Sequence, residues 1–482
     1  MTPQLVVPFG NADWLAIAPP TIAGLAALLV ILADLILPRR SRRGVAIAIA
    51  IAGLAVAGVV AARGWGHPFV AFGGAFVQSG FGIVFEEIVV VAAIFSLLLA
   101  NVLGRDDQAG GAIALLLWSA SGAMLMAGAA NLMTIFLGLE LLSLALYCLC
   151  GISPRAGARE AALKYLILSS TASAILLYGM ALLFGATGSV ALSALAAPPA
   201  SVALYDLGCG MLLVGLCFKL SLVPFHVWTP DVYEGAPLPV TAFMSVVTKA
   251  GTLAVLARFA YVAIPPTEAK TLLLPLWIVA GLSMIAGNVA ALAQTDVKRL
   301  LAYSGIAQLG YIVAALAGTS ALGLRYAMFY LAAYAFMNLG AFFVVGLLSR
   351  EREEGARLAS FAGLGYRQPV LAAAMTFFLL ALAGLPPTAG FTGKVLILAT
   401  AVDRGYAWLA VLLIIGTAIS VYAYFKIVRA MYARTAGAPI VKAVLPLSPL
   451  PWIGVGVCAV LTLVLGLYPL TPSDVLPFVR TP

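Results

Sequence analysis

Apolar stretches of helical length follow one another along nearly the whole chain, and this repetition limits the folds it can adopt. A helix needs about 20 apolar residues to cross a bilayer, because each residue adds about 1.5 Å and the hydrocarbon layer is about 30 Å thick. Charged residues make up 9% of the sequence, against about 25% in soluble domains. A β-barrel would need strands of alternating polarity, and these stretches are continuously apolar. The sequence therefore predicts an all-α, polytopic membrane protein.

Fourteen membrane-spanning helices are expected, and no soluble domain interrupts them, so residues 1–482 are expected to form a single membrane domain. The expected spans are 12–37, 44–62, 79–103, 109–127, 130–151, 158–185, 203–223, 237–263, 270–292, 299–318, 322–349, 368–402, 404–432 and 447–470.

Basic residues gather in alternate connections between these spans. They occur at 39–43, 105, 155–164, 298–299, 350–367 and 426–442, whereas the opposite connections hold few. Because cytoplasmic loops carry the excess of Lys and Arg, these connections are expected in the cytoplasm and both termini outside. The net charge of +9 is then a topology signal, and we expect no nucleic-acid partner.

Four ionisable residues lie near the middle of expected spans: Glu140, Lys219, Lys249 and Lys394. Counting from the span ends places each about 14 to 20 Å deep. A charged side chain at that depth costs about 2.5 to 3.5 kcal/mol on insertion scales, and by default marks an ion pathway or a proton relay. We expect the four to form a row along the membrane midplane that binds and passes protons. For Glu140 and Lys219 the alternative is a structural ion pair.

Two of the expected spans are interrupted by helix-breaking residues next to a lysine. Pro224, Pro230, Pro237 and Pro239 follow Lys219, and the segment GLPPTAGFTGK ends at Lys394. Irregular backbone at membrane depth occurs where it is buried in protein or lines a wet cavity, and transporters often pair such broken helices. We therefore expect two broken helices; simple proline kinks are the alternative.

Other polar residues near these breaks are candidates for passing protons. His226 follows Pro224 and could relay protons, or could be a structural histidine. Tyr303, Ser304 and Gln308 in the tenth expected span could carry water between the two halves, or could only bond to neighbouring helices.

Four acidic residues are expected near the membrane surface. Asp231 and Glu234 could line an entrance beside the first break or cap a turn. Glu86 and Glu87 lie near the start of the third expected span and are expected at the membrane interface.

No cofactor or metal is expected in this chain. All five cysteines lie within spans and lack the spacing of a metal site. The sequence contains no phosphate-binding glycine loop and no dinucleotide-binding fingerprint.

Four segments resemble the antiporter-like membrane subunits of bacterial respiratory complex I (NADH:quinone oxidoreductase). They are GLELLSLALYCL, KLSLVPFHVWTPDVYEGAPLPVTAFMSVVTK, TDVKRLLAYSGIAQLGYI and GLPPTAGFTGK. The wording TPDVYEGAP at 229–237 is typical of the subunit N branch, and the chain ends without the long lateral helix expected of subunit L.

The resemblance implies two inverted five-helix repeats at 109–263 and 270–432, in which helices 7 and 12 are broken. Residues 1–108 would form the first three helices and 447–470 the last. Glu140 would pair with Lys219, Lys249 would be the central relay, and Lys394 would face the second half-channel.

The implied function is proton translocation, driven by redox chemistry in other subunits, in the inner (plasma) membrane of a bacterium. The chain would hold no redox centre, because the flavin, iron–sulfur clusters and quinone of the complex belong elsewhere. Its partners would be lipids and other membrane subunits, with K-like and M-like subunits as neighbours. The alternative is a stand-alone or Mrp-type cation/proton antiporter; a third possibility is a non-pumping scaffold.

Overall fold

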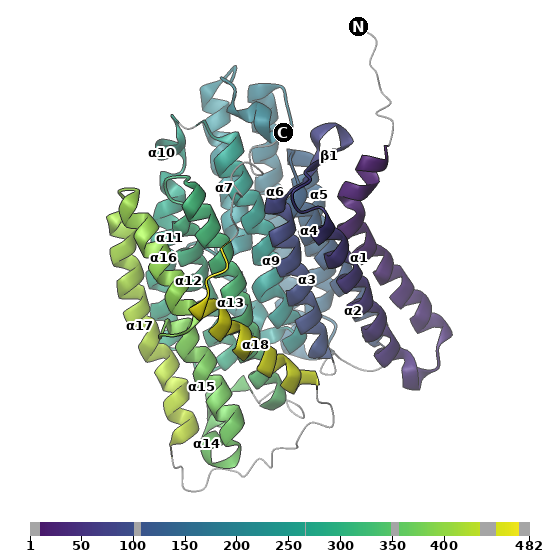
Figure 1. Ribbon diagram of the computed structural model, residues 1–482, viewed down its shortest axis with the longest axis vertical. Coiled ribbons are helices and arrows are strands. Elements are labelled where there is room, and N and C mark those ends of the chain that lie inside the picture. Colours follow the sequence, from purple (N-terminus) through teal and green to yellow (C-terminus); the bar gives the residue numbers. More distant parts are fainter. Residues whose placement is uncertain (1–9, 101–107, 266, 349–355, 434–449, 472–482) are drawn as a thin grey trace.

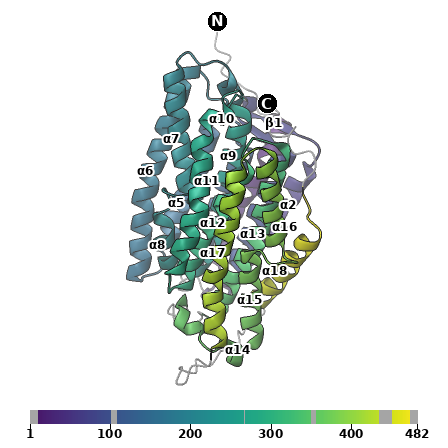
Figure 2. The ribbon, with the colours of Figure 1, turned by 90° about the vertical axis from the view of Figure 1, so that its left-hand side faces the viewer.

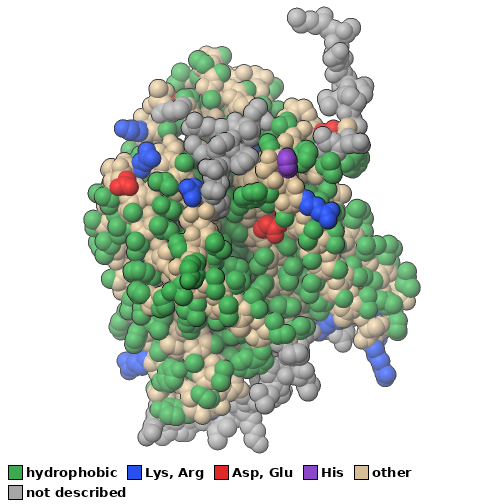
Figure 3. All heavy atoms as spheres, in the orientation of Figure 1, with side chains coloured by type: hydrophobic (Ala, Val, Ile, Leu, Met, Phe, Trp, Pro, Cys, Tyr) green, Lys and Arg blue, Asp and Glu red, His purple; other side chains and the backbone are tan. Residues whose placement is uncertain are grey.

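The computed structural model describes residues 10–100, 108–265, 267–348, 356–433 and 450–471. The chain forms a bundle of helices that run mostly along the long axis of the molecule (Figure 1). Figure 2 shows the same bundle from the side, with β1 near one end and α14 near the other. Figure 3 shows a largely apolar face, as a surface in contact with lipid requires.

The first helices form a group at one side of the bundle (Figure 1). They are α1 (Asn11–Ile36), α2 (Arg39–Arg63) and α3 (Gly80–Leu98). Between α2 and α3 lies a short antiparallel hairpin of β1 (Phe69–Ala71) and β2 (Phe76–Gln78). Helix α1 also packs against α4, and α3 against α4 and α9, which join this group to the rest of the bundle.

The middle of the chain supplies α4 (Ala109–Gly128), α5 (Leu132–Cys150), α6 (Ala156–Thr187), α7 (Val202–Leu220), α8 (Trp228–Gly235) and α9 (Leu238–Arg258). Every residue of α9 is buried, so this helix lies in the core of the bundle. A π-helical turn at Phe259–Ala263 extends it. Helix α9 is apolar all round except at Lys249, Arg258 and a few hydroxyls, as its central position requires.

The later part supplies α10 (Ala269–Leu272), α11 (Leu274–Leu292), α12 (Val297–Ala315), α13 (Ala321–Leu348), α14 (Leu364–Arg367), α15 (Pro369–Ala383), α16 (Ala389–Asp403), α17 (Ala407–Tyr432) and α18 (Leu450–Leu467). Helix α13 packs against α9, α12, α15, α16 and α18 and so joins the two parts of the chain.

Glycines let several helix pairs approach closely. An added Cβ on Gly179 of α6 would lie 2.8 Å from Leu212 N and 2.9 Å from Gly208 O of α7. Gly122 of α4 and Gly287 of α11 face neighbouring backbone in the same way. Small residues at these contacts are how membrane helices pack without a hydrophobic driving force between them.

The expected all-α polytopic fold is confirmed. Twelve helices among the described residues are long and apolar enough to cross a membrane. The expected spans 299–318 and 368–402 correspond to α12 and to α15 with α16, and 270–292 is divided between α10 and α11. The division into two inverted repeats stays a prediction. Several residues used in the topology argument lie outside the described residues: Arg105, Arg350, Arg352, Arg434, Lys442 and Arg480.

Candidate functional site

The first broken helix is interrupted between α7 and α8. Helix α7 ends at Leu220, and Ser221 then turns the chain with a left-handed backbone, φ 62°. The carbonyl groups in the last turn of a helix lack partners within the helix. Here Lys249 of α9 donates from Nζ to Lys219 O at 2.9 Å and to Ser221 Oγ. The ammonium group therefore caps the negative end of the α7 dipole inside the protein.

The second broken helix has the same arrangement between α15 and α16. Helix α15 ends at Ala383, and Gly384 follows with φ 88°. Lys394 of α16 donates from Nζ to Leu382 O and to Ala383 O, both at 3.0 Å. The counterpart of Lys394 in the first break is therefore Lys249, although in the sequence Lys219 stands nearest to the prolines of that break.

Lys219 lies in a different environment, among hydroxyl groups. It is 2% exposed, and its Nζ donates to Ser143 Oγ at 2.7 Å and to Ser169 Oγ at 2.6 Å. The ring centroids of Tyr165 and Tyr147 lie 5.5 and 5.8 Å from this nitrogen, within the range of cation–π attraction. All four of these contacts are to neutral side chains or rings, and no ion pair joins Glu140 to this ammonium group among the described residues.

Glu140 does not form the direct pair with Lys219 that we expected. The carboxylate is half-buried, and its Oε1 has no hydrogen-bond partner among the described residues. Ser143, one turn further along α5, occupies the place beside Lys219 Nζ where the carboxylate was expected. Glu140 is near enough for an electrostatic interaction with Lys219. A role for Glu140 in the row of charges stays a prediction.

Gln308 is joined to the second break. Its Nε2 donates to Leu382 O at 3.0 Å, the same carbonyl that accepts from Lys394. Tyr330 OH donates to Gln308 Oε1 at 2.6 Å. Gln308 therefore extends the hydrogen-bonded group around Lys394 into α12 and α13.

Ser304, Tyr303 and His226 contact different parts of the structure. Ser304 shares a hydrogen bond with Tyr424 of α17. Tyr303 lies instead beside His226 of the first break, with ring centroids 6.3 Å apart. His226 is half-buried, and its Nδ1 has no hydrogen-bond partner among the described residues.

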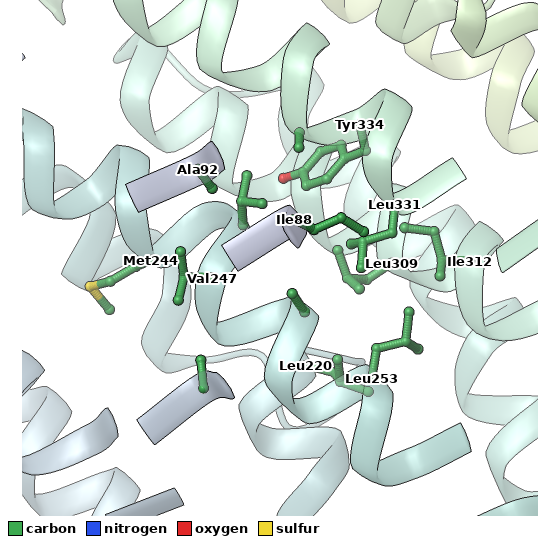
Figure 4. Close-up of a cluster of buried hydrophobic side chains, with 14 of the residues drawn as sticks. Ile88, Ala92, Leu220, Met244, Val247, Leu253, Leu309, Ile312, Leu331 and Tyr334 are labelled. Carbon is green, nitrogen blue, oxygen red and sulfur yellow. The ribbon is translucent and has the colours of Figure 1, made fainter. Parts of the chain in front are cut away.

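An apolar cluster brings together the neighbours of the two hydrogen-bonded groups. Leu220 follows Lys219, and Leu253 lies one turn after Lys249; both share the cluster with Leu309 and Ile312, which follow Gln308 (Figure 4). Within the part of the chain that the structure describes, no hydrogen bond joins the group around Lys249 to the group around Lys394. A proton crossing this region would need water to enter the cluster.

A charged cavity of about 470 Å³ lies at the end of the bundle where α6 and α12 begin and α8 packs. Asp231 accepts from Lys164 Nζ at 2.9 Å and from Arg299 at 2.6 Å. Partial burial acts to raise the pKa of Asp231, but these two hydrogen bonds outweigh it and hold the pKa below the usual range. Arg299 also pairs with Glu234 at 2.9 Å. Asp231 and Glu234 thus line a cavity through ion pairs instead of capping a turn.

Sequence reasoning missed the residues that hold the lysines in place. Ser143, Ser169, Ser221 and Thr229 lie in apolar segments, where a hydroxyl resembles a packing residue. The sequence marks Lys298 only as a basic residue of a loop, but it is buried and donates to Glu234 O and Ala236 O, both at 2.7 Å, at the end of α8. A hydroxyl one helical turn from an intramembrane charge is the signal that could have found Ser143.

Glu86 also differs from its expected position. We expected it at the membrane interface, but it is 0% exposed in the interior of the first group of helices. Among the described residues, no group of three or more His, Cys, Asp or Glu side chains is placed to hold a metal ion. The five cysteines are free thiols, and four of them are buried.

Comparisons with known proteins show what this chain is similar to. The model of the family described as NADH:quinone oxidoreductase/Mrp antiporter, TM, matches residues 129–420. The NADH-quinone oxidoreductase subunit N 1 of Symbiobacterium thermophilum is 44% identical and covers 88% of this chain and 89% of its own. A chain of respiratory complex I from Thermus thermophilus superposes with a TM-score of 0.80 at 37% identity, covering 96% of this chain and 99% of that one. A chain of the Mrp complex from Dietzia has a TM-score of 0.79 at 20% identity, with coverage of 97% and 95%; it shares the fold.

Proposed function

The chain belongs to the NADH:quinone oxidoreductase/Mrp antiporter transmembrane family, and on this premise we propose that its buried lysines carry protons across the membrane. Within the family it is a proton-translocating membrane subunit of NADH-quinone oxidoreductase, of the subunit N type. The observation that carries the proposal is the burial of Lys219, Lys249 and Lys394 at the two helix breaks, where no acid forms an ion pair with them among the described residues.

The two breaks supply a way to load and unload a lysine. In the structure Lys249 and Lys394 each donate to backbone carbonyls that have no partner within their own helix. These acceptors stabilise the charged form of the lysine. A small movement of the helix end would remove them, and a buried ammonium group without acceptors releases its proton. The breaks are the parts of α7 and α15 where such a movement needs the fewest hydrogen bonds to be disrupted.

Protons would enter at the charged cavity around Asp231, Lys164 and Arg299, and His226 would relay them towards Lys219 and Lys249. Tyr303 lies beside His226 and belongs to this entrance. Gln308, joined to Lys394 through Leu382 O, would belong to the second half of the path. Ser304 would support it through Tyr424.

The chain itself would hold no redox centre, flavin, iron–sulfur cluster or quinone. The energy for transport would come from redox chemistry in other subunits, through movements of neighbouring membrane subunits of the K-like and M-like kinds. Glu140 is half-buried on α5, next to the exposed side chains of Leu137 and Leu141. A carboxylate is costly against lipid, so we expect a neighbouring subunit to cover this face. The chain would lie in a bacterial inner membrane with both termini in the periplasm.

The alternative, an Mrp-type cation/proton antiporter, has only the shared fold in its favour. Isolation of the complex through a tag on this chain separates the two. We expect flavin and iron–sulfur subunits to be purified with it in mild detergent. A cation-dependent complex without redox centres would contradict the assignment.

The relay is tested in the same complex, reconstituted into vesicles. We expect Lys219→Ala and Lys249→Ala each to lower proton pumping while the complex still assembles. Lys270→Ala is the matched control, because Lys270 is exposed at the surface of the bundle. Normal pumping by either buried-lysine variant would contradict the relay.

A further inference from the structure

A second buried acid lies outside the row of lysines, near the start of α3. Glu86 is 0% exposed and follows the first residue of α3 by six positions, about 9 Å along the helix. The segment just before α3 is β2 of the short hairpin. An ionised carboxylate buried at this depth is costly unless it is paired with a cation or fully hydrogen-bonded.

The partners of Glu86 satisfy only one of its two oxygens. Gln78 of β2 donates from Nε2 to Glu86 Oε2 at 2.7 Å. Glu86 Oε1, Gln78 Oε1 and Ser79 Oγ are buried and have no hydrogen-bond partner among the described residues. Gln78 is 2% exposed and Ser79 is 0% exposed, so protein atoms cover all three groups.

The surrounding charges do not balance a carboxylate at this position. Glu87, the next residue on α3, is half-buried and acidic. Arg258 at the end of α9 is buried, but its hydrogen bond goes to Ala127 O, and it forms no ion pair with Glu86 in the described part of the chain. Arg63, the last residue of α2, and His67, which follows it, are exposed.

The other helices that pack against α3 add no further carboxylate or cation near Glu86. Helix α4 contains no titratable residue, and α13 and α18 contribute only tyrosines, Arg325 and Cys458. Lys249, the remaining cation of α9, is hydrogen-bonded at the first break. Glu86 Oε1 therefore has no hydrogen-bond donor, and no cation forms an ion pair with the carboxylate among the described residues.

We propose that Glu86 is a proton-binding site of its own, separate from the lysines, and that Gln78 is its partner in both protonation states. With the carboxylate, the amide of Gln78 donates from Nε2, as the structure has it. With the carboxylic acid, the amide rotates by half a turn and Oε1 accepts the proton of the acid. The proton is taken from solvent on the hairpin side of the membrane and returned to it.

The place of this site suggests where it acts. The hairpin lies beside the start of α5, where Ala130 N donates to Ala75 O, whereas the charged cavity around Asp231 lies at the start of α6, beyond the opposite end of α5. Glu86 is therefore placed to hold a proton on the side where protons leave. This assignment to the exit rests on the proposed function, whereas the binding of a proton by Glu86 does not.

Infrared spectroscopy of the whole purified complex tests the binding. We expect the difference between wild type and Glu86→Gln to show one carboxylic-acid carbonyl band that shifts in heavy water. Glu87→Gln is the matched control, because it removes the neighbouring carboxyl group from the same helix, and it should keep the band. If the spectrum of Glu86→Gln is the same as that of wild type, the proposal is wrong. This holds whether or not the variant complex still pumps protons.

Gln78→Leu tests the hydrogen bond between Gln78 and Glu86 without removing the carboxyl group. It also tests the proposal if the Glu86→Gln complex does not assemble. Loss of the amide should move the carbonyl band to higher frequency, because a carboxylic acid without a hydrogen-bond acceptor absorbs there. An unchanged band in Gln78→Leu would overturn the role of Gln78.

Discussion

The two helix breaks hold their lysines with different kinds of acceptor. At the first break Lys249 donates to one carbonyl and to the hydroxyl of Ser221, which in turn accepts from Thr229 Oγ1 at 2.6 Å. At the second break Lys394 donates only to the carbonyls of Leu382 and Ala383. A carbonyl can only accept, whereas a hydroxyl can accept from one neighbour and donate to another.

This difference indicates how each break passes a proton. The first break contains groups that can move a proton by reorienting, namely Ser221, Thr229 and the two serines beside Lys219. The second break fixes its lysine with backbone, and Gln308 is the side chain that shares its acceptor. We infer that Lys394 exchanges its proton through water or a moving backbone, whereas Lys249 has a side-chain route.

The largest effect is expected at Ser221. Ser221→Ala removes the hydroxyl that accepts from Lys249, and hydrogen bonds to charged groups contribute about 1.5 to 3 kcal/mol. We expect proton pumping to fall by about tenfold or more, since about 1.4 kcal/mol corresponds to tenfold in rate. Ser221→Gly relieves the left-handed backbone but also lacks the hydroxyl, so it should assemble well and pump as poorly. Normal pumping by Ser221→Gly would show that the hydroxyl is not needed for proton transfer. The proposed difference between the two breaks would then be wrong.

Gly384 offers the corresponding test of the second break. Alanine in a left-handed conformation costs about 1 to 2 kcal/mol. Its Cβ would also lie 3.0 Å from Lys394 Cδ and displace the lysine from its carbonyls. We expect Gly384→Ala to lower both the yield of complex and the pumping rate. Gly405→Ala is the control, because Gly405 has φ 81° and open space around its Cβ position; equal losses in both variants would mean that only backbone strain matters.

A smaller effect concerns the neighbours of Lys219. Because Ser143 touches the ammonium group and Glu140 does not, Ser143→Ala and Lys219→Ala should be coupled by about 0.5 to 3 kcal/mol in a double-mutant cycle. The cycle between Glu140→Gln and Lys219→Ala should give a smaller coupling. Pumping rates of the wild type, the three single variants and the two double variants supply both values. A stronger coupling for Glu140 would restore the direct pair expected from the sequence.

The smallest effect is expected at the entrance, which lies far from both breaks. The pKa of Asp231 is lower in the folded protein than the ordinary value of 3.8. The stabilisation from its ion pairs is therefore present above pH 3.8 and is lost as the pH falls below it. For a pair of this exposure it amounts to about 0.2 to 1 kcal/mol. The melting temperature of Asp231→Asn should lie slightly below that of wild type from pH 5 to 8, and the difference should close in acid; a constant difference would mean that the charge has no part in it.

The positions of the helices and of the buried charges follow from the sequence because lipid imposes a simple rule. A span must be about 20 apolar residues long, and a lysine within it has few functions other than transport. Proline and glycine likewise mark both breaks, because proline lacks the N–H of the helical hydrogen-bond ladder and glycine readily adopts a left-handed turn. These properties depend on residues close together in the chain, and so they can be read from it.

The partners of the charged groups could not be predicted in the same way. Ser143 replaces Glu140 beside Lys219, and Lys249 replaces Lys219 as the counterpart of Lys394, because contacts between helices depend on how each helix is rotated. Burial of Glu86 has the same cause: α2, α4 and α9 close around a position that lies near a helix end in the sequence. Hydrophobic patterns place a residue along a helix axis, but they fix its rotation poorly when the helix is apolar all round.

The central claim is that Lys249 and Lys394 release and rebind protons and do not merely cap helix ends. Arginine keeps the charge and can still donate to carbonyls, but it does not release its proton, because its pKa stays above about 12. The most direct measurement is therefore the ratio of protons pumped to quinone reduced by Lys249→Arg and Lys394→Arg complexes in sealed vesicles. We expect both complexes to assemble and both to pump fewer protons for each quinone reduced. A wild-type ratio in both variants would show that the two lysines are caps alone.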